Sequence, residues 1–125
     1  MQTSEISPLA LLESMTAVKL AEVLGVKVNT VYSWKSGKRN PPKTAKKLAY
    51  LFRLEQNQEL LTDKNLPISP LELTYQYPLE LKDLASLMGV TLRSVKAWKE
   101  KDRSPKLTAQ KLAGLILRKW QSQSN

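Results

Sequence analysis

The chain has 125 residues and a formal net charge of +9, with 20 lysines and arginines against 11 aspartates and glutamates. This length fits one domain or two small ones, and the positive charge favours a polyanionic partner. Cysteine and histidine are both missing, which excludes disulfides, thiolate sites and the commonest general base. We therefore expect a protein that is not an enzyme and that binds no metal and no cofactor.

Neither a membrane segment nor a targeting segment is predicted. Apolar runs such as LAGLIL at residues 112–117 are far shorter than the roughly 20 residues of a membrane-spanning helix. The N-terminal residues include Glu5 and Glu13 and lack the basic region of a secretory signal. We expect a cytoplasmic protein without a membrane partner.

The sequence contains two copies of one unit. A shift of 64 residues aligns residues 17–51 with residues 81–115 without a gap, and fifteen aligned positions are identical. The stretch SPLAL at 7–11 recurs as SPLEL at 69–73, so the second copy has two extra residues before its second helix. Two copies are too few for a solenoid. We predict a first domain at 1–61, a linker at 62–68 and a second domain at 69–125.

Each unit is predicted to begin with two helices, the second of which ends in a tight turn. Ser7 and Ser69 can cap a short first helix, because each precedes a proline at the first helical position. Thr16 is a candidate cap for the second helix of the first unit. Gly25 and Gly89 are expected to end the second helices, where a residue with positive φ is needed.

Two more helices complete each unit. The third helices are predicted at residues 28–36 and 92–100, and the longer fourth helices at 44–60 and 108–121. Pro41 and Pro105 prevent the third helices from continuing. Nowhere do apolar and polar residues alternate for long enough to indicate a strand. The predicted fold class is all-α, with two tandem helix-turn-helix domains of about four helices each and no sheet.

A tight turn between two helices, followed by a basic loop, is the layout of the helix-turn-helix motif. The stretch LAEVLGVKVNTVYSWKSGKRNPPKTAKKLAYLF at 20–52 resembles the Cro and lambda-repressor-like (XRE-type) family, whose Leu-Ala, Gly-Val, Trp, Gly-Lys-Arg and Pro landmarks occur in order. The stretch at 84–117 looks like a degraded copy, with Lys101 where the family has glycine. The resemblance covers most of both halves and implies a fold that binds double-stranded DNA.

The third helices have an inner and an outer face on a helical wheel. Val31 and Trp34 mark the inner face, and both recur in the second copy. The tryptophans are therefore expected in the core rather than stacked on bases. The residues expected to read bases are Asn29, Tyr32, Ser33 and Ser36 in the first unit and Arg93, Lys96, Ala97 and Glu100 in the second. These positions all differ between the copies, as either surface drift or two different reading surfaces would produce.

Basic side chains gather around and after each third helix, where members of the family contact the sugar-phosphate backbone. Between Glu22 and Glu55 no acidic residue occurs. Contacts to phosphate position a protein on DNA without reading its sequence. The residues expected to contact phosphate are Lys27, Thr30, Lys35, Lys38, Arg39, Lys43 and Lys47 in the first unit and Ser94, Lys99, Lys101, Arg103, Lys106 and Lys111 in the second.

Together these features predict a sequence-specific protein that binds double-stranded DNA, a transcriptional regulator of bacterial or phage type. Its two units would occupy an asymmetric or two-turn site at the nucleoid, either as one chain or after self-association through the fourth helices. One alternative is an architectural or accessory factor for recombination, transposition or plasmid maintenance. Another is an antitoxin-like module in which the second unit, with Glu100 and Asp102, binds a protein partner. No small-molecule site is evident.

Overall fold

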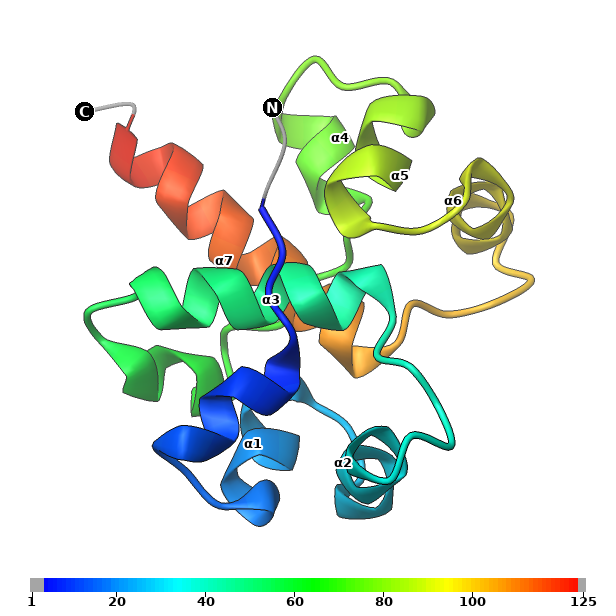
Figure 1. The fold of residues 1–125 in the computed structure, drawn as a ribbon. Helices are drawn as coiled ribbons and strands as arrows, with labels where there is room; N and C mark the ends of the chain where they lie inside the picture. Colours follow the sequence, from blue (N-terminus) through cyan, green and yellow to red (C-terminus); the bar gives the residue numbers. More distant parts are fainter. Residues whose placement is uncertain (1–3, 124–125) are drawn as a thin grey trace.

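The computed structural model describes residues 4–123, which form helices and contain no strand, so the all-α prediction is confirmed (Figure 1). In chain order the elements are η1 (Pro8–Glu13), α1 (Ala17–Leu24), α2 (Val28–Lys35), α3 (Lys43–Leu54), η2 (Gln58–Thr62), α4 (Glu72–Gln76), α5 (Leu81–Met88), α6 (Leu92–Lys99) and α7 (Leu107–Gln123), where η denotes a 3-10 helix. The pairs α1 with α2 and α5 with α6 are the two helix-turn-helix motifs.

The predicted helix boundaries in the first part of each unit are confirmed with one exception, the start of α4. The Ser7 hydroxyl accepts a hydrogen bond from the backbone N–H of Leu9 and caps η1, and the Thr16 hydroxyl accepts one from the N–H of Lys19, three residues later, and caps α1. The Ser69 hydroxyl accepts one from the N–H of Leu71, but α4 begins at Glu72, so the prediction that Ser69 caps this helix is wrong. Gly25 and Gly89 end α1 and α5 in the left-handed conformation, with φ of 71° and 70°. Local hydrogen bonds of Ser7 and Thr16 and the left-handed conformation of the two glycines therefore position these ends.

The predicted fourth helix of the first unit is too long. α3 ends at Leu54, not at residue 60, and the chain turns before continuing as η2. The amide of Gln58 donates to the Phe52 carbonyl at 3.2 Å across this turn. The turn brings Leu61 into the core, where it is fully buried. The apolar pattern in the sequence continues past the end of α3 because its last buried residue, Leu61, belongs to η2.

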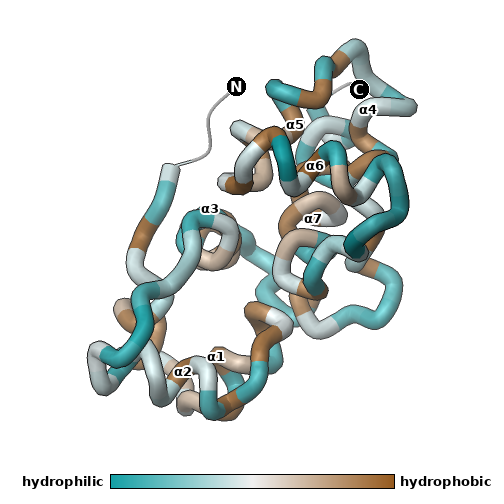
Figure 2. Tube along the Cα trace, turned by 90° about the vertical axis from the view of Figure 1, so that its right-hand side faces the viewer, coloured by the Kyte–Doolittle hydropathy of each residue, from teal (hydrophilic) through white to brown (hydrophobic). Residues whose placement is uncertain are grey.

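The two repeat units share one hydrophobic core. α3 and α7 are in contact at the centre of the molecule (Figures 1 and 2). One continuous cluster of buried residues includes the matching stripes of both helices. These stripes are formed by Ala45, Leu48 and Ala49 in α3 and by Ala109, Leu112 and Ala113 in α7. The motifs are thus fixed to each other through their fourth helices, while the predicted boundaries between the units stay a prediction.

Each fourth helix also caps a helix of the other unit. Thr44 at the start of α3 donates its hydroxyl to the Met88 carbonyl at 2.6 Å, and Thr108 at the start of α7 donates to the Leu24 carbonyl at 2.7 Å. Met88 and Leu24 are the last residues of α5 and α1, whose carbonyls have no partner within the helix. The shift of 64 residues relates the two contacts, so the same capping interaction occurs twice.

The segment predicted as a linker is packed against α7. Leu66 is only 1% exposed, and the backbone N–H of Ile68 donates to the Gln110 carbonyl at 3.2 Å. A Cβ atom at Gly114 would collide with the carbonyl oxygen of Leu66. Only glycine therefore allows the chain to cross α7 at this position, and the connection between the units follows a defined path.

We expect Thr108→Val to lower the free energy of unfolding by about 1–2 kcal/mol, because the buried Leu24 carbonyl would lose its partner. Thr62→Val is the matched control: its hydroxyl bonds to an exposed carbonyl three residues away, which water can replace, so a change within about 0.5 kcal/mol is expected. Urea denaturation followed by circular dichroism measures both. A shared core predicts a single transition; separate transitions for the two repeats would contradict the packing described here.

Candidate nucleic-acid interface

The two predicted recognition helices, α2 and α6, lie on the same side of the molecule, one towards each end. Both lie at the right in Figure 1, and Figure 2 views that side directly. The shared core and the reciprocal caps hold the two motifs in this arrangement. A single ligand with two equivalent grooves could therefore meet the outer faces of both helices at once.

The outer face of α2 is polar and carries no acidic residue. Val31 and Trp34 are buried beneath it, as predicted. Asn29, Tyr32 and Ser36 are exposed. The fourth candidate, Ser33, is partly buried, and its carbonyl accepts a hydrogen bond from the Ser36 hydroxyl at 3.2 Å. Asn29 and Tyr32 are the larger of the exposed side chains on this face.

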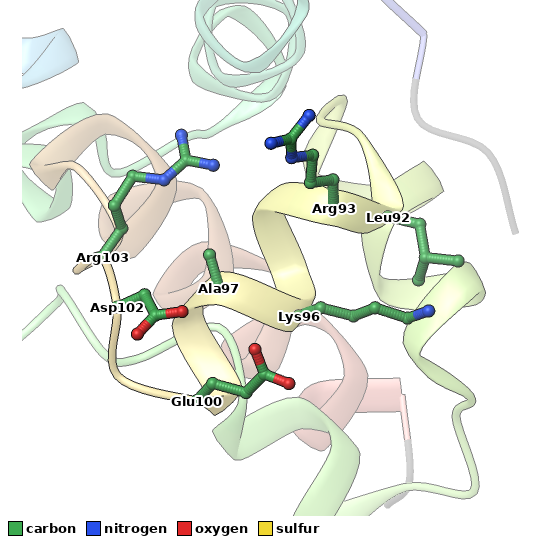
Figure 3. Close-up of a pocket in the computed structure, with 7 residues that line it drawn as sticks. All are labelled: Leu92, Arg93, Lys96, Ala97, Glu100, Asp102 and Arg103. Carbon is green, nitrogen blue, oxygen red and sulfur yellow. The ribbon is translucent and has the colours of Figure 1, made fainter.

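The outer face of α6 has mixed charge. Val95 and Trp98 are buried beneath it, while Arg93, Lys96 and Glu100 are exposed. An open depression of about 510 Å³ covers this face (Figure 3), lined by Leu92, Arg93, Lys96, Ala97, Glu100, Asp102 and Arg103. Arg93 and Arg103 extend to the same side of it in Figure 3, and the carboxylates of Glu100 and Asp102 lie on the other.

Ala97 lies in this depression and differs from the other base-reading candidates because it is only 8% exposed. Its methyl group is flanked by longer side chains of α6. A ligand that enters the depression meets at most a small apolar surface here. Ala97 therefore lies on the outer side of α6, as predicted, but it forms the floor of the depression and has little exposed surface.

Most of the candidate phosphate contacts are at the surface. Thr30 and Ser94 are partly buried, near the start of α2 and α6. The exposed cations are Lys27, Lys35, Lys38, Arg39, Lys43, Lys99, Lys101, Arg103 and Lys106. Within residues 4–123, the salt bridges join Lys19 to Glu22 and Lys82 to Glu80, and none of those exposed cations takes part. Their charge is thus available to an anionic ligand.

Lys111 was predicted to contact phosphate at the surface, but its side chain is buried. Its side chain is only 6% exposed, and its Nζ atom donates to the carbonyls of Glu22, Val23 and Leu61 at 2.6, 3.2 and 2.8 Å. The ammonium satisfies carbonyls at the end of α1, where a helix favours positive charge. Burial lowers the pKa of Lys111, an effect that Glu22 opposes and Lys19 reinforces.

Lys47 occupies the matching position in α3 and is also 6% exposed, so its prediction as a phosphate contact is corrected for the same reason. The sequence does contain the signal for this burial. Lys47 follows Thr44 by three residues and precedes Leu51 by four, the spacing of one helix face, and both neighbours are buried. A lysine that recurs in both copies on that face indicates an internal contact rather than a surface cation.

Thr91 caps α6 next to the candidate interface, a role that the sequence-based prediction missed. Its hydroxyl accepts a hydrogen bond from the backbone N–H of Ser94 at 3.1 Å, and its side chain also bonds to the Ser94 hydroxyl at 3.1 Å. The matching residue, Lys27, makes no side-chain cap on α2. Threonine before a predicted helix is a capping signal, and here it fixes the start of the helix that carries Arg93.

No family model, no curated protein and no solved structure matches this chain. The resemblance to the Cro-like family therefore stays a prediction. Within residues 4–123, no group of three or more potential ligands could hold a metal ion, and no helix is long and apolar enough to cross a membrane. The arrangement of the helices and the distribution of charge are therefore the observations that support a nucleic-acid interface.

Replacing Lys111 with methionine is expected to lower the free energy of unfolding by about 1–3 kcal/mol, because three carbonyls lose their donor. The pKa of Lys111 is lowered by folding. The unfolded chain therefore binds this proton more tightly, and the stability contributed by Lys111 should rise as the pH increases towards the ordinary lysine value of about 10.4.

Urea denaturation of the parent chain and of Lys111→Met at several pH values measures this difference. The control is Lys106→Met, which removes an exposed lysine near the start of the same helix and should change stability by less than about 0.5 kcal/mol. Equal effects of the two substitutions would contradict the internal role of Lys111, and a difference that shrinks with rising pH would contradict the lowered pKa.

Lys101 keeps a glycine-like backbone in the loop after α6. It is the one non-glycine residue with positive φ in residues 4–123, at 65°, and it matches Gly37, whose φ is 84°. This conformation costs an L-residue roughly 1–2 kcal/mol. We expect Lys101→Gly to raise the midpoint of thermal unfolding, with Lys96→Gly, in the middle of α6, as a control that lowers it. A lower midpoint for Lys101→Gly would show that the lysine side chain stabilises the loop.

Proposed function

We propose that the chain is a sequence-specific double-stranded DNA-binding protein that regulates transcription by occupying its site. The observation that carries this proposal is the fixed placement of α2 and α6 on one side of the molecule, each followed by exposed cations. A helix-turn-helix motif inserts its second helix into the major groove and contacts the backbone on either side. Both motifs of this chain can do so together.

The size of the molecule suits two neighbouring turns of DNA. Successive major grooves on one side of B-form DNA are about 34 Å apart. A compact chain of 125 residues is roughly 35 Å across, from the usual dependence of radius on length. This width is an upper limit on the spacing of α2 and α6, and it is close to the length of one helical turn.

The side chains on the two helices suit different bases. The amide of Asn29 can bond to adenine through N6 and N7, and the guanidinium of Arg93 can bond to guanine through O6 and N7. Both side chains are exposed. Each such pair provides about 1–3 kcal/mol of discrimination, so the two motifs would prefer different half-sites.

A second candidate function is supported by the mixed charge of the α6 depression. Glu100 and Asp102 line it together with Arg93 and Arg103, whereas no acidic residue occurs between Glu22 and Glu55 in the first unit. In this alternative α2 binds DNA and α6 binds a protein segment of mixed charge, as in an antitoxin-like module. Charge reversal of Arg93 that leaves DNA affinity unchanged would support it.

An architectural role in recombination, transposition or plasmid maintenance uses the same interface. A rigid body with two motifs on one face can impose its own curvature on DNA, because bending the duplex is balanced by additional contacts. Circular-permutation gel shifts would separate the two roles: strong bending supports the architectural role, and a nearly straight complex supports simple occupation of a site.

The proposal predicts a steep dependence of DNA affinity on salt. If about eight of the exposed cations each neutralise a phosphate, the slope of log K against log salt should be near −7. Fluorescence anisotropy of a labelled duplex at increasing salt measures it. Lys38→Gln is expected to reduce the magnitude of the slope by about 1, whereas Lys64→Gln, in the loop after η2, should leave it unchanged. A parent slope near −1 would refute the proposed interface.

A further inference from the structure

The contacts between the two repeat units are reciprocal. Thr44 of the first unit bonds to Met88 of the second, and Thr108 of the second bonds to Leu24 of the first. Under the shift of 64 residues, Thr44 corresponds to Thr108 and Leu24 to Met88. When residue i contacts residue j and the equivalent of j contacts the equivalent of i, the two copies are related by a two-fold rotation.

The turns of the two motifs show the same reciprocity. A Cβ atom at Gly25 would lie 2.8 Å from Leu107, and one at Gly89 would lie 2.8 Å from Lys43. Gly25 corresponds to Gly89, and Lys43 corresponds to Leu107. Two copies arranged head to tail would form one contact of each kind and leave the other open. The presence of both excludes a head-to-tail arrangement of the units.

The direction of this two-fold axis follows from the helices that it relates. α3 and α7 correspond to each other and are in contact, so the axis passes between them. The axis also exchanges α2 and α6, which lie on one side of the molecule (Figures 1 and 2). It therefore points out of that side, as the symmetry axis of a dimeric repressor points at its operator.

We propose that one chain binds one duplex as a built-in dimer, with α2 and α6 on two unlike half-sites arranged as an imperfect inverted repeat. This inference rests on the proposed function and assigns the symmetry of its DNA site. The two-fold relation requires inverted rather than direct half-sites, because duplex DNA also has two-fold axes perpendicular to its length. The different outer residues of the two helices make the half-sites differ in sequence.

The connection between the units leaves the motifs no freedom to adopt the opposite orientation. Leu61 and Leu66 are buried, and the segment between them is held at both ends by the core. The capping bonds of Thr44 and Thr108 fix the same relation at two further points. A flexible tether would allow direct and inverted half-sites alike, whereas this packing allows one arrangement at one spacing.

Transplanting the outer face of α6 onto α2 gives the sharpest test. The variant carries Asn29→Arg, Tyr32→Lys, Ser33→Ala and Ser36→Glu, all at positions outside the buried core. Both motifs then present the same residues on related scaffolds. Selection from a random duplex pool longer than two helical turns should give an imperfect inverted repeat with the parent chain and a perfect palindrome with the variant.

The reverse transplant is the matched control. Arg93→Asn, Lys96→Tyr, Ala97→Ser and Glu100→Ser place the α2 residues on α6, and a palindrome of the other half-site is expected. Circular dichroism reports whether each variant is folded, so either transplant can test the proposal if the other does not fold. Direct repeats, or a single half-site with no second one, would overturn the inference while leaving DNA binding in place.

Two measurements complete the test. Turning one half-site around in the selected sequence should weaken binding by about 100-fold, because the second motif loses its intramolecular contact; unchanged affinity would overturn the inference. Sedimentation of the complex should give one chain per duplex, and two chains per palindrome would overturn it. If the parent chain enriches no sequence and binds no duplex, the proposed function itself fails, which is a distinct outcome.

Discussion

The structure depends on the exchange of helix caps between the two repeats. The C-terminal carbonyls of α1 receive donors from Thr108 and Lys111 of α7, and α5 receives one from Thr44 of α3. Each unmet buried carbonyl would cost about 1–3 kcal/mol. A unit of about 60 residues is marginal alone because it buries little surface. Neither helix-turn-helix motif is therefore complete without the fourth helix of the other.

Much of this fold is predictable because local signals determine it. Thr16 and Gly25 specify the two ends of α1, and Gly89 ends α5 in the same way, whereas a hydrogen bond from the backbone N–H of Glu80 to Asp83 marks the start of α5. The end of α3 is not predictable in this way, because Leu61 continues the apolar pattern from a separate element. Helix periodicity reports which residues are buried but not which element buries them. The packing of Leu66 on α7 is likewise a long-range contact with no local signal beyond Gly114.

The exposure of the candidate site residues was predicted correctly for most of them and wrongly for the two buried lysines, Lys47 and Lys111. Identity between the repeats has two physical origins here. Lys35 and its counterpart recur at the surface, where phosphate contact is the expected role, whereas Lys47 and Lys111 recur because each lies on the buried face of a fourth helix. In the sequence, a surface lysine and a buried lysine look the same. The contacts of Lys111 with backbone carbonyls of the other unit show that it is a buried lysine with an internal role.

A symmetric scaffold with two unlike outer faces has a consequence for specificity. In a homodimer, any substitution on a recognition helix changes both half-sites together. In this chain Asn29 and Arg93 can differ, because the two positions are encoded separately while α3 and α7 keep the spacing between them. The buried residues that set the two-fold relation and the exposed residues that meet the ligand are therefore independent sets. Substitutions on one helix can therefore change one outer face of the protein and, under the proposed function, one half-site, without disturbing the geometry of the whole.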